Sequence, residues 1–281
     1  KTFLDYETTL KLHILRSNLG DLMMKVVLTI AGSDSSGGAG IQADLKTFEA
    51  FGVFGTSALT VLTAQNTAGV RSIQEIPVAF IKEQIQAVLD DFDVAAIKIG
   101  MLFSKDIIEA VDSMITNLNI PIVLDPVFIS KVGSPLLQDD AVEAMKKLFE
   151  KVSVITPNMH EAEQLFGYKH ADSESLERLV ASPCPVLVKH QVLELPDANV
   201  SVDQLFTGHQ KRVFQSPMLE TTNLHGTGCS YSSAIAANLA LGKTLEEAIE
   251  ISKEFVYQAI LNAPNIGHGA GPINHKAGVK C

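Results

Sequence analysis

The segment at residues 223–237, NLHGTGCSYSSAIAA, combines two glycines and a cysteine with the start of a run of small apolar residues. Gly226 and Gly228 allow positive φ and close approach of a ligand, and the run after Cys229 predicts a buried helix. A helix N-terminus offers free N–H groups and partial positive charge, which attract phosphate and lower the pKa of a thiol. We therefore predict an anion site at Gly226, Thr227 and Gly228, with Cys229 as a neighbouring base. The alternative is a tight turn with a buried cysteine.

A second glycine-rich segment, GSDSSGGAGIQAD, follows the apolar run at residues 25–31. The run predicts a buried parallel strand, and a strand-to-helix turn after it indicates a ligand at the carboxyl end of the sheet. Gly38-Ala39 stand where a Walker A loop has Lys-Ser/Thr, and the GxGxxG spacing is absent, so neither familiar phosphate loop fits. A tight turn with close helix packing is the alternative.

Polar side chains follow several later predicted strands. The amide of Gln65 can donate to and accept from the edge of a heterocycle, or it can serve a turn. Asp125 can orient magnesium-bound water or phosphate oxygens, or it can form an Asx turn. Asn158 and Glu161 stand three apart at a predicted helix start, where they can share a hydrated cation or cap the helix.

Strands and helices alternate along nearly the whole chain. Strands are expected at residues 57–64, 95–99, 121–124, 152–155 and 185–189, and helices at 45–51, 78–91, 105–118, 141–150, 230–241 and 245–261. An irregular connection is expected from residue 190 to 203, followed by short hairpin strands at 205–206 and 212–214. The alternation predicts one α/β domain over residues 24–281, with a mostly parallel sheet between helices. Residues 1–23 lack the features of a signal peptide, and we expect them to be an extension or frame remnant upstream of Met23 or Met24.

Composition limits the class of protein. The chain has 281 residues, of which 46% are hydrophobic, and a net charge of −10 without a basic cluster, which argues against a nucleic-acid partner. Three cysteines without CxxC spacing indicate a reducing, cytoplasmic location and no disulfide framework. The histidines show no zinc spacing, and no apolar run is long enough to span a membrane.

Seven separate segments between residues 25 and 275 can be compared with known families by their order and spacing. They are AGSDSSGGAGIQADLKTF, AQNT, KIGML, LDPV, ITPNMHEAE, NLHGTGCSYSSAIAA and GHGAGPINH. Together they resemble the hydroxymethylpyrimidine and hydroxymethylpyrimidine-phosphate kinases of thiamin biosynthesis, a branch of the ribokinase-like kinases. The resemblance implies a three-layer α/β/α fold and two successive transfers of the γ-phosphoryl group of ATP, with Mg²⁺ present. The first acceptor would be the hydroxymethyl oxygen of the pyrimidine and the second its monophosphate. A homodimer is also implied.

The resemblance also implies roles for individual residues. The residues that would hold the pyrimidine are Gly32, Ala39, Asp44, Gln65, Met101 and Val127. Asp44 and Gln65 would hydrogen-bond the ring and its amino group. The GTGC turn would form the anion hole, and Cys229 would take the position of the base, where many ribokinase-like relatives carry aspartate. Asp125 and Glu161 would act on magnesium, partly through water, with Asn158 and Lys189 beside the nucleotide.

One stretch departs from the family pattern. After the lysine the family usually continues Gly-Gly-His, whereas this chain reads His190-Gln191-Val192, which predicts weaker ATP binding or a changed nucleotide preference. The nearest rival function is that of a pyridoxal or pyridoxine kinase, since some enzymes of this shape phosphorylate vitamin B6. Rivals of other classes are a non-catalytic binder of vitamin precursors and a hydrolase using Cys229 and His225. The hydrolase would lack the G-x-[SC]-x-G elbow.

Overall fold

The structure is a computed structural model that describes residues 24–128, 136–169, 173–195 and 199–277. The extension expected at residues 1–23 lies outside the described residues. Within them, no helix has both the length and the apolar character needed to cross a lipid bilayer.

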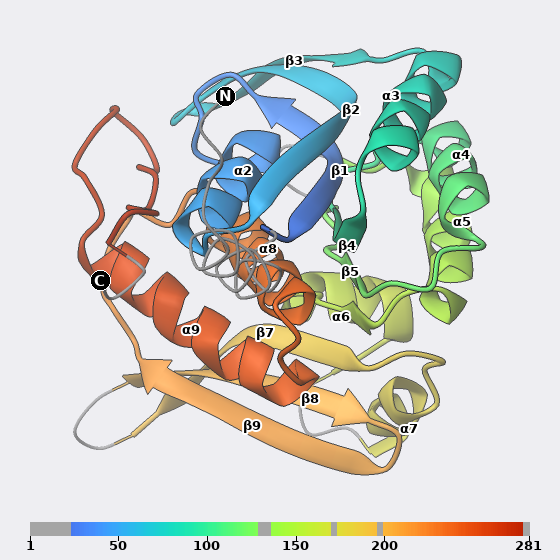
Figure 1. Cartoon of the computed structure of the whole chain (residues 1–281). Helices are drawn as coiled ribbons and strands as arrows, with labels where there is room; N and C mark the ends of the chain where they lie inside the picture. Colours follow the sequence, from blue (N-terminus) through green and yellow to red (C-terminus); the bar gives the residue numbers. More distant parts are fainter. Residues whose placement is uncertain (1–23, 129–135, 170–172, 196–198, 278–281) are drawn as a thin grey trace, which may run out of the picture.

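The described residues build one nine-stranded sheet in the order β3-β2-β1-β4-β5-β6-β7-β8-β9, with β3 and β9 at its two edges (Figure 1). The strands are β1 (Val26–Asp34), β2 (Phe54–Asn66), β3 (Gly69–Glu75), β4 (Val94–Ile99), β5 (Ile122–Leu124), β6 (Val154–Ile155), β7 (Val186–Glu194), β8 (Asn199–Thr207) and β9 (Gln210–Pro217). Neighbours from β2 to β7 pair in parallel, whereas β3, β8 and β9 pair antiparallel. The mostly parallel sheet predicted from the sequence is confirmed.

Helices cover both faces of this sheet (Figure 1). One layer holds α2 (Gly40–Ala50), α8 (Thr227–Ala240) and α9 (Leu245–Leu261). The other holds α3 (Val78–Asp91), α4 (Lys105–Ile115), α5 (Val142–Lys147), α6 (Met159–Phe166) and α7 (Ser173–Val180). Successive side chains of a strand point to opposite faces, so one strand serves both layers. In β1, Leu28 and Ile30 pack in the core under α3 and α4, while Val27 packs with α2 and α8.

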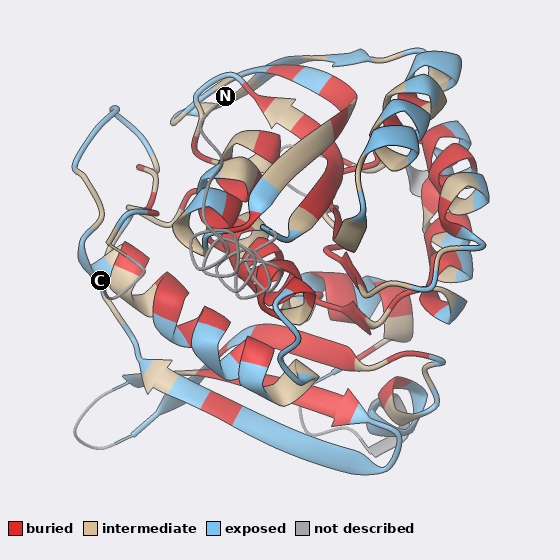
Figure 2. Ribbon diagram, in the orientation of Figure 1, coloured by how far each residue is buried: buried red, intermediate tan, exposed pale blue. Residues whose placement is uncertain are grey.

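Burial follows from this three-layer arrangement. Buried residues fill the central strands and the inner sides of the helices, and exposed residues lie on the outer sides (Figure 2). The interior is therefore divided by the sheet into two apolar clusters. Because the parallel strands are covered on both faces, they read in the sequence as short continuous apolar runs rather than as alternating ones.

Several element predictions are wrong. Most of the irregular connection expected at residues 190–203 is strand, because β7 continues to Glu194 and β8 begins at Asn199; residues 196–198 lie outside the described residues. The helix expected at residues 141–150 is divided into α5 and two flanking 3₁₀ turns, η1 (Asp139–Ala141) and η2 (Leu148–Glu150). Edge strand β3 was not predicted, since its side chains are exposed or half-buried and it shows no apolar run. The single-domain assignment stays a prediction.

Candidate active site

A cavity of about 400 Å³ opens at the carboxyl ends of the parallel strands, against the N-terminus of α8. This is where open α/β sheets bind ligands. The cavity brings together thirteen of the fourteen predicted site residues, from seven separate segments. They are Gly32, Ala39, Gln65, Met101, Asp125, Val127, Asn158, Glu161, Lys189, Gly226, Thr227, Gly228 and Cys229.

The two glycine-rich loops pack directly against each other. Gly226 has φ +84°, and a Cβ added there would lie only 1.8 Å from the carbonyl oxygen of Gly38. A Cβ on Gly38 would in turn lie 2.3 Å from Cδ2 of His225. Only glycine fits either position. Gly228 differs from the prediction, because it lies inside α8 with ordinary helical φ, and a Cβ there would make ordinary contact, 3.5 Å from Nζ of Lys189.

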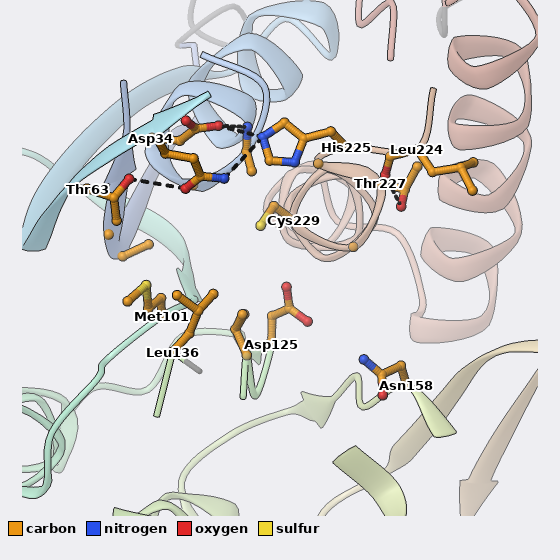
Figure 3. A pocket seen from close by; sticks show the side chains of 18 of the residues that line it. Asp34, Thr63, Met101, Asp125, Leu136, Asn158, Leu224, His225, Thr227 and Cys229 are labelled. Carbon is orange, nitrogen blue, oxygen red and sulfur yellow. Dashed lines mark hydrogen bonds and ion pairs between the residues drawn. The ribbon is translucent and has the colours of Figure 1, made fainter. Parts of the chain in front are cut away.

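Two helices begin at the cavity. Gly226 is the N-cap of α8, and within the described residues no side chain caps that end. The first N–H groups of a helix have no intrahelical acceptor, so this end can bind an anion. The helix α2 begins at Gly40, whose N–H donates to the sulfur of Cys229. Figure 3 shows Cys229 pointing from α8 into the space between Asp34 and Asp125.

The prediction of a lowered thiol pKa is wrong for the ligand-free protein. Burial raises the pKa of Cys229 to about 11. The ammonium of Lys98 and the N–H of Gly40 act to lower it, but the carboxylates of Asp125 and Asp44 act with burial. A position at a helix N-terminus is therefore outweighed here by a buried setting shared with two carboxylates.

The role of Asp44 as a hydrogen-bonding reader of the pyrimidine stays a prediction, and the structure gives its carboxylate other partners. Asp44 is fully buried beneath the cavity and does not line it. Its carboxylate accepts from Oγ1 of Thr29 at 2.6 Å, from Oγ of Ser233 at 2.7 Å and from Nζ of Lys98 at 2.9 Å. Lys98 itself lines the cavity, and Asp44 raises its pKa although burial opposes the charge. The prediction missed Lys98, whose only sequence signal is a charge inside the apolar strand AAIKI.

A second group of side chains that sequence analysis missed fixes the first loop. Asp34 ends β1 and accepts backbone N–H groups from Ser36, Gly38 and Ala39 at 2.8–3.1 Å. Its Oδ2 also lies 2.8 Å from Nε2 of His225 (Figure 3). Burial would raise the pKa of Asp34, but His225 and the loop donors lower it to about 2. A permanent carboxylate therefore ties the first loop to the loop before α8.

The amide of Gln65 lies in the same corner of the cavity. Its Oε1 accepts from Oγ1 of Thr63 at 3.1 Å, and its Nε2 lies 3.4 Å from Nε2 of His225 (Figure 3). These contacts hold an amide whose atoms can both donate and accept at the cavity wall. The interpretation of Gln65 as a ligand reader fits this placement and stays a prediction.

An ion-pair cluster lies on the other side of Cys229. Nζ of Lys189 is 2.8 Å from Oδ1 of Asp125, and both side chains are buried. Burial opposes ionisation of Asp125, but Lys189 and Lys98 lower its pKa. Burial raises the pKa of Glu161 to about 7, against the attraction of Lys189. A cation bound next to this cluster would therefore stabilise the ionised form of Glu161.

The capping alternative for Asn158 and Glu161 is confirmed. Oδ1 of Asn158 accepts the N–H of Glu161 at 2.9 Å, and Oε2 of Glu161 accepts the N–H of Asn158 at 2.8 Å. This reciprocal pair is a capping box at the start of α6. Both side chains also line the cavity, so sharing a hydrated cation stays a prediction.

A second cavity, of about 520 Å³, adjoins the first across the beginning of α8. Both cavities are lined by Asn158, His160, Lys189, His190, Leu224 and Thr227. The second continues between β8, β9 and α9, where its wall includes the apolar residues Val192, Met218, Leu219, Val256 and Ile260. The site can therefore take two ligands that meet at the GTGC turn.

Comparison with known proteins gives a consistent picture. A family model described as phosphomethylpyrimidine kinase matches residues 34–274. The hydroxymethylpyrimidine/phosphomethylpyrimidine kinase of Haemophilus influenzae is 45% identical over 262 residues, which cover 90% of this chain and 97% of that protein.

Solved structures of two kinds superpose on the chain. The phosphomethylpyrimidine kinase of Clostridium difficile 630 is 41% identical with a TM-score of 0.71, covering 84% of this chain and 99% of that one. The pyridoxal kinase of Bacillus subtilis, solved as an ADP complex, is 35% identical with a TM-score of 0.80, covering 91% and 98%.

The matched residues 34–274 include all but the first two residues of the first glycine-rich loop, the whole second loop, the ion-pair cluster and the helices that begin at the cavity. The identity to the Haemophilus influenzae protein extends over nearly the full length of both chains. The chain belongs to the phosphomethylpyrimidine kinase family.

Proposed function

We propose that this chain uses ATP to phosphorylate 4-amino-5-hydroxymethyl-2-methylpyrimidine and then its monophosphate, giving the diphosphate used in thiamin biosynthesis. The observation that carries the proposal is the pair of adjoining cavities with an uncapped helix N-terminus between them. A kinase must hold two substrates in line across one phosphoryl group, and this arrangement supplies both places.

The acceptor belongs in the first cavity. Gln65 offers a donor and an acceptor to the ring edge, and Met101 and Val127 offer apolar contacts. Gly32 allows Val61 and Met101 to pack against the first loop, since a Cβ would lie 2.8 Å from Cγ2 of Val61 and 3.1 Å from Sδ of Met101. The hydroxymethyl oxygen would then face Cys229, and Ala39 completes the wall beside it.

The transfer forms a bond between the acceptor oxygen and the γ-phosphorus and breaks the bond to the β-phosphate oxygen, which leaves as ADP. N–H groups at Gly226 and Gly228 would stabilise charge on the transferring group. The N–H of Thr227 donates to the carbonyl oxygen of Leu224 at 3.3 Å and would be shared with that group, and Lys189 would stand beside it. In the first transfer the hydroxymethyl proton passes to the sulfur of Cys229, which must be a thiolate beforehand. Since Asp125 helps to keep this thiol protonated, neutralising Asp125 on nucleotide binding would favour the thiolate.

Magnesium fits the donor set in part. Asp125 and Glu161 offer carboxylate oxygens, the ligands Mg²⁺ prefers. Among the described residues, no group of three or more histidine, cysteine or acidic side chains converges on one point. Asp125 and Glu161 would therefore hold a magnesium that keeps several waters and is carried by the nucleotide, and the ion would neutralise phosphate charge. The raised pKa of Glu161 supports this, because a nearby cation would stabilise its ionised form.

Pyridoxal kinase activity is the second candidate. The observation in its favour is the superposition on the Bacillus subtilis pyridoxal kinase, which has the higher TM-score and covers more of this chain than the Clostridium difficile enzyme does. Pyridoxal also carries a hydroxymethyl acceptor, so the same mechanism would serve.

We also propose a cytoplasmic location and a homodimer. The free cysteines Cys184 and Cys229 suit the reducing cytoplasm, and light scattering would test the homodimer.

The experiment offers hydroxymethylpyrimidine, its monophosphate and pyridoxal separately, with ATP and magnesium, and follows ADP formation and product mass. Turnover of both pyrimidines to the diphosphate with little on pyridoxal would support the proposal. Preference for pyridoxal would transfer the function to vitamin B6 salvage. Asp125→Asn protein purified in parallel excludes a contaminating kinase, and no turnover of any acceptor would overturn the proposal.

A further inference from the structure

Strand β7 carries a bulge where it enters the active site. Its register with β8 shifts between Val188 and Gln191, so that Lys189 and His190 together oppose the single residue Asp203. His190 has φ +61°, a left-handed conformation that is costly for a residue with a Cβ. A bulge re-aims the side chains around it. Something in the surrounding structure must therefore hold this one in place.

Lys189 is the side chain that the bulge directs into the reaction centre. Its N–H donates to the carbonyl oxygen of Pro157 at 2.9 Å, and its Nζ lies 2.8 Å from Oδ1 of Asp125. The side chain is 3% exposed, so a shift of the bulge would leave a buried ammonium and a buried carboxylate unpaired. The position of Lys189 thus depends on the backbone shape at the next residue, His190.

The carboxylate of Asp203 closes the bulge from behind. Its Oδ1 accepts the N–H of His190 at 2.9 Å. Its Oδ2 accepts from the hydroxyl of Tyr231 at 2.9 Å and from Nζ of Lys253 at 2.7 Å. Asp203 is 1% exposed, and although burial disfavours its charge, Lys253 lowers its pKa. One ionised group therefore joins β7 to α8, which begins at the anion site, and to α9.

We propose that Asp203 is a positioning residue for phosphoryl transfer, holding the Lys189–His190 bulge in the shape that directs Lys189 toward Asp125 and borders the nucleotide cavity. Asp203 borders the second cavity, but its two carboxylate oxygens are taken up by His190, Tyr231 and Lys253, so it acts through Lys189 and His190. The part of this inference that concerns the nucleotide rests on the proposed function, whereas the hydrogen bond to His190 does not.

Hydrogen–deuterium exchange tests the hydrogen bond itself. In Asp203→Ala the amide of His190 loses its acceptor, and we expect its exchange to become at least tenfold faster, measured in peptides that cover β7. Phe255→Leu is the matched control, because Phe255 is a buried α9 residue whose ring packs tilted against the ring of Phe51, with 5.0 Å between the ring centroids, and it takes no part in the hydrogen bonds of Asp203. It should destabilise the protein without a local change in β7.

Steady-state kinetics tests the positioning. Asp203→Ala should raise KM for ATP at least fivefold and leave KM for the acceptor within twofold, since the acceptor lies at the other cavity. A merely destabilised enzyme would lose active fraction, and so kcat, with both KM values unchanged, as expected for Phe255→Leu. Glycine adopts positive φ without strain. In a His190→Gly background the effect of Asp203→Ala on KM for ATP should therefore fall below twofold.

Unchanged exchange at His190 in Asp203→Ala would overturn the inference, whatever the substrate proves to be. Changed exchange with an unaltered KM for ATP, or an equal effect in the His190→Gly background, would also overturn it. A wild-type protein that neither binds ADP nor turns over any of the three acceptors would instead overturn the proposed function, and the exchange experiment would still decide whether Asp203 holds the bulge.

Discussion

The pKa of the Cys229 thiol is set by opposing effects of its position at a helix N-terminus and of its buried surroundings. The N-terminus of α8 and Lys98 favour a thiolate, but burial and two carboxylates raise the pKa of the thiol to about 11. At neutral pH the ligand-free protein thus holds a thiol. A base role therefore requires a change in the surrounding charges that lowers this pKa, such as neutralisation of Asp125.

Replacing Cys229 separates the two transfers. Cys229→Ala should slow phosphorylation of hydroxymethylpyrimidine by about a hundredfold or more, the usual contribution of general-base catalysis. Phosphorylation of the monophosphate should fall by less than about tenfold, since that acceptor is already ionised. Single-turnover rates with each acceptor measure the effect. Cys229→Ser, which keeps the size of the side chain, serves as control, and equal losses in both steps would refute the base role.

At the scale of elements, the N-terminal end of α8 depends on two glycines, Gly226 and Gly228, which have different roles. Gly226 lets the loop pass against Gly38, while Gly228 leaves space at the first turn beside Lys189. The same helix ends next to Gly242, which has φ +81° and no atom within 4 Å of an added Cβ. Gly242 therefore has a positive φ like that of Gly226, but no neighbouring atoms would clash with a side chain there.

Alanine at these three glycines should give three different results. Gly226→Ala adds both strain and a clash with backbone, and we expect a fall in Tm of roughly 5–10 °C from a loss of about 3 kcal/mol. Gly242→Ala adds only strain, about 1 kcal/mol. Gly228→Ala should leave Tm within about 2 °C but lower kcat about tenfold, because its methyl group narrows the anion site. Thermal melts and turnover measure all three, and equal melting losses at Gly226 and Gly242 would exclude the clash.

Strand β7 contains His190-Gln191-Val192, the stretch that differs from the family pattern. The sequence predicted weaker ATP binding from His190-Gln191, and the structure places His190 at positive φ on the border of both cavities. His190→Gly/Gln191→Gly should therefore tighten ADP binding, by about threefold to tenfold, because glycines let the backbone lie closer to the nucleotide phosphates. Titration calorimetry measures the affinity, with Leu193→Ala as a control, because Leu193 is an exposed residue of the same strand that lines neither cavity. An unchanged dissociation constant would contradict the expectation.

Over the whole molecule, features that depend on neighbouring residues could be predicted from the sequence, and features that depend on contacts between distant segments could not. Apolar runs and helix signals such as those of α3 and α9 are local, and their bounds were predicted closely. Motifs at strand ends converge because parallel strands share an edge, so Cys229 and Asp125 could be placed in one site.

Other features depend on partners far away in the sequence. Lys98 meets Asp44 across 54 residues, and the slip in β7 depends on its pairing with β8. The thiol pKa of Cys229 depends on charges from three other segments. No local pattern records these contacts, which explains why a helix N-terminus alone gave the wrong direction for the pKa.

Acid stability is a property of the whole molecule to which one buried histidine contributes. His275, in the C-terminal segment, is 8% exposed, and its Nε2 lies 2.9 Å from Oγ of Ser230 in α8. Burial, and then the charge of Lys46, lower the pKa of His275 from 6.5 to about 4. Between these two values the unfolded chain binds a proton that the folded protein does not. The free energy of unfolding therefore falls as pH drops from 6.5 to 4.

His275→Gln removes this titration while keeping an acceptor for Ser230. At pH 7 the variant should be slightly less stable than the wild type, by about 1 kcal/mol for an altered buried contact. Near pH 4.5 the order should reverse, because the wild type alone loses up to about 3 kcal/mol through His275. Urea unfolding between pH 4.5 and 7.5 measures the difference, with the exposed His209→Gln as control. A stability difference that does not change with pH would show that His275 is protonated equally in both states, and the burial argument for the C-terminal segment would then be wrong.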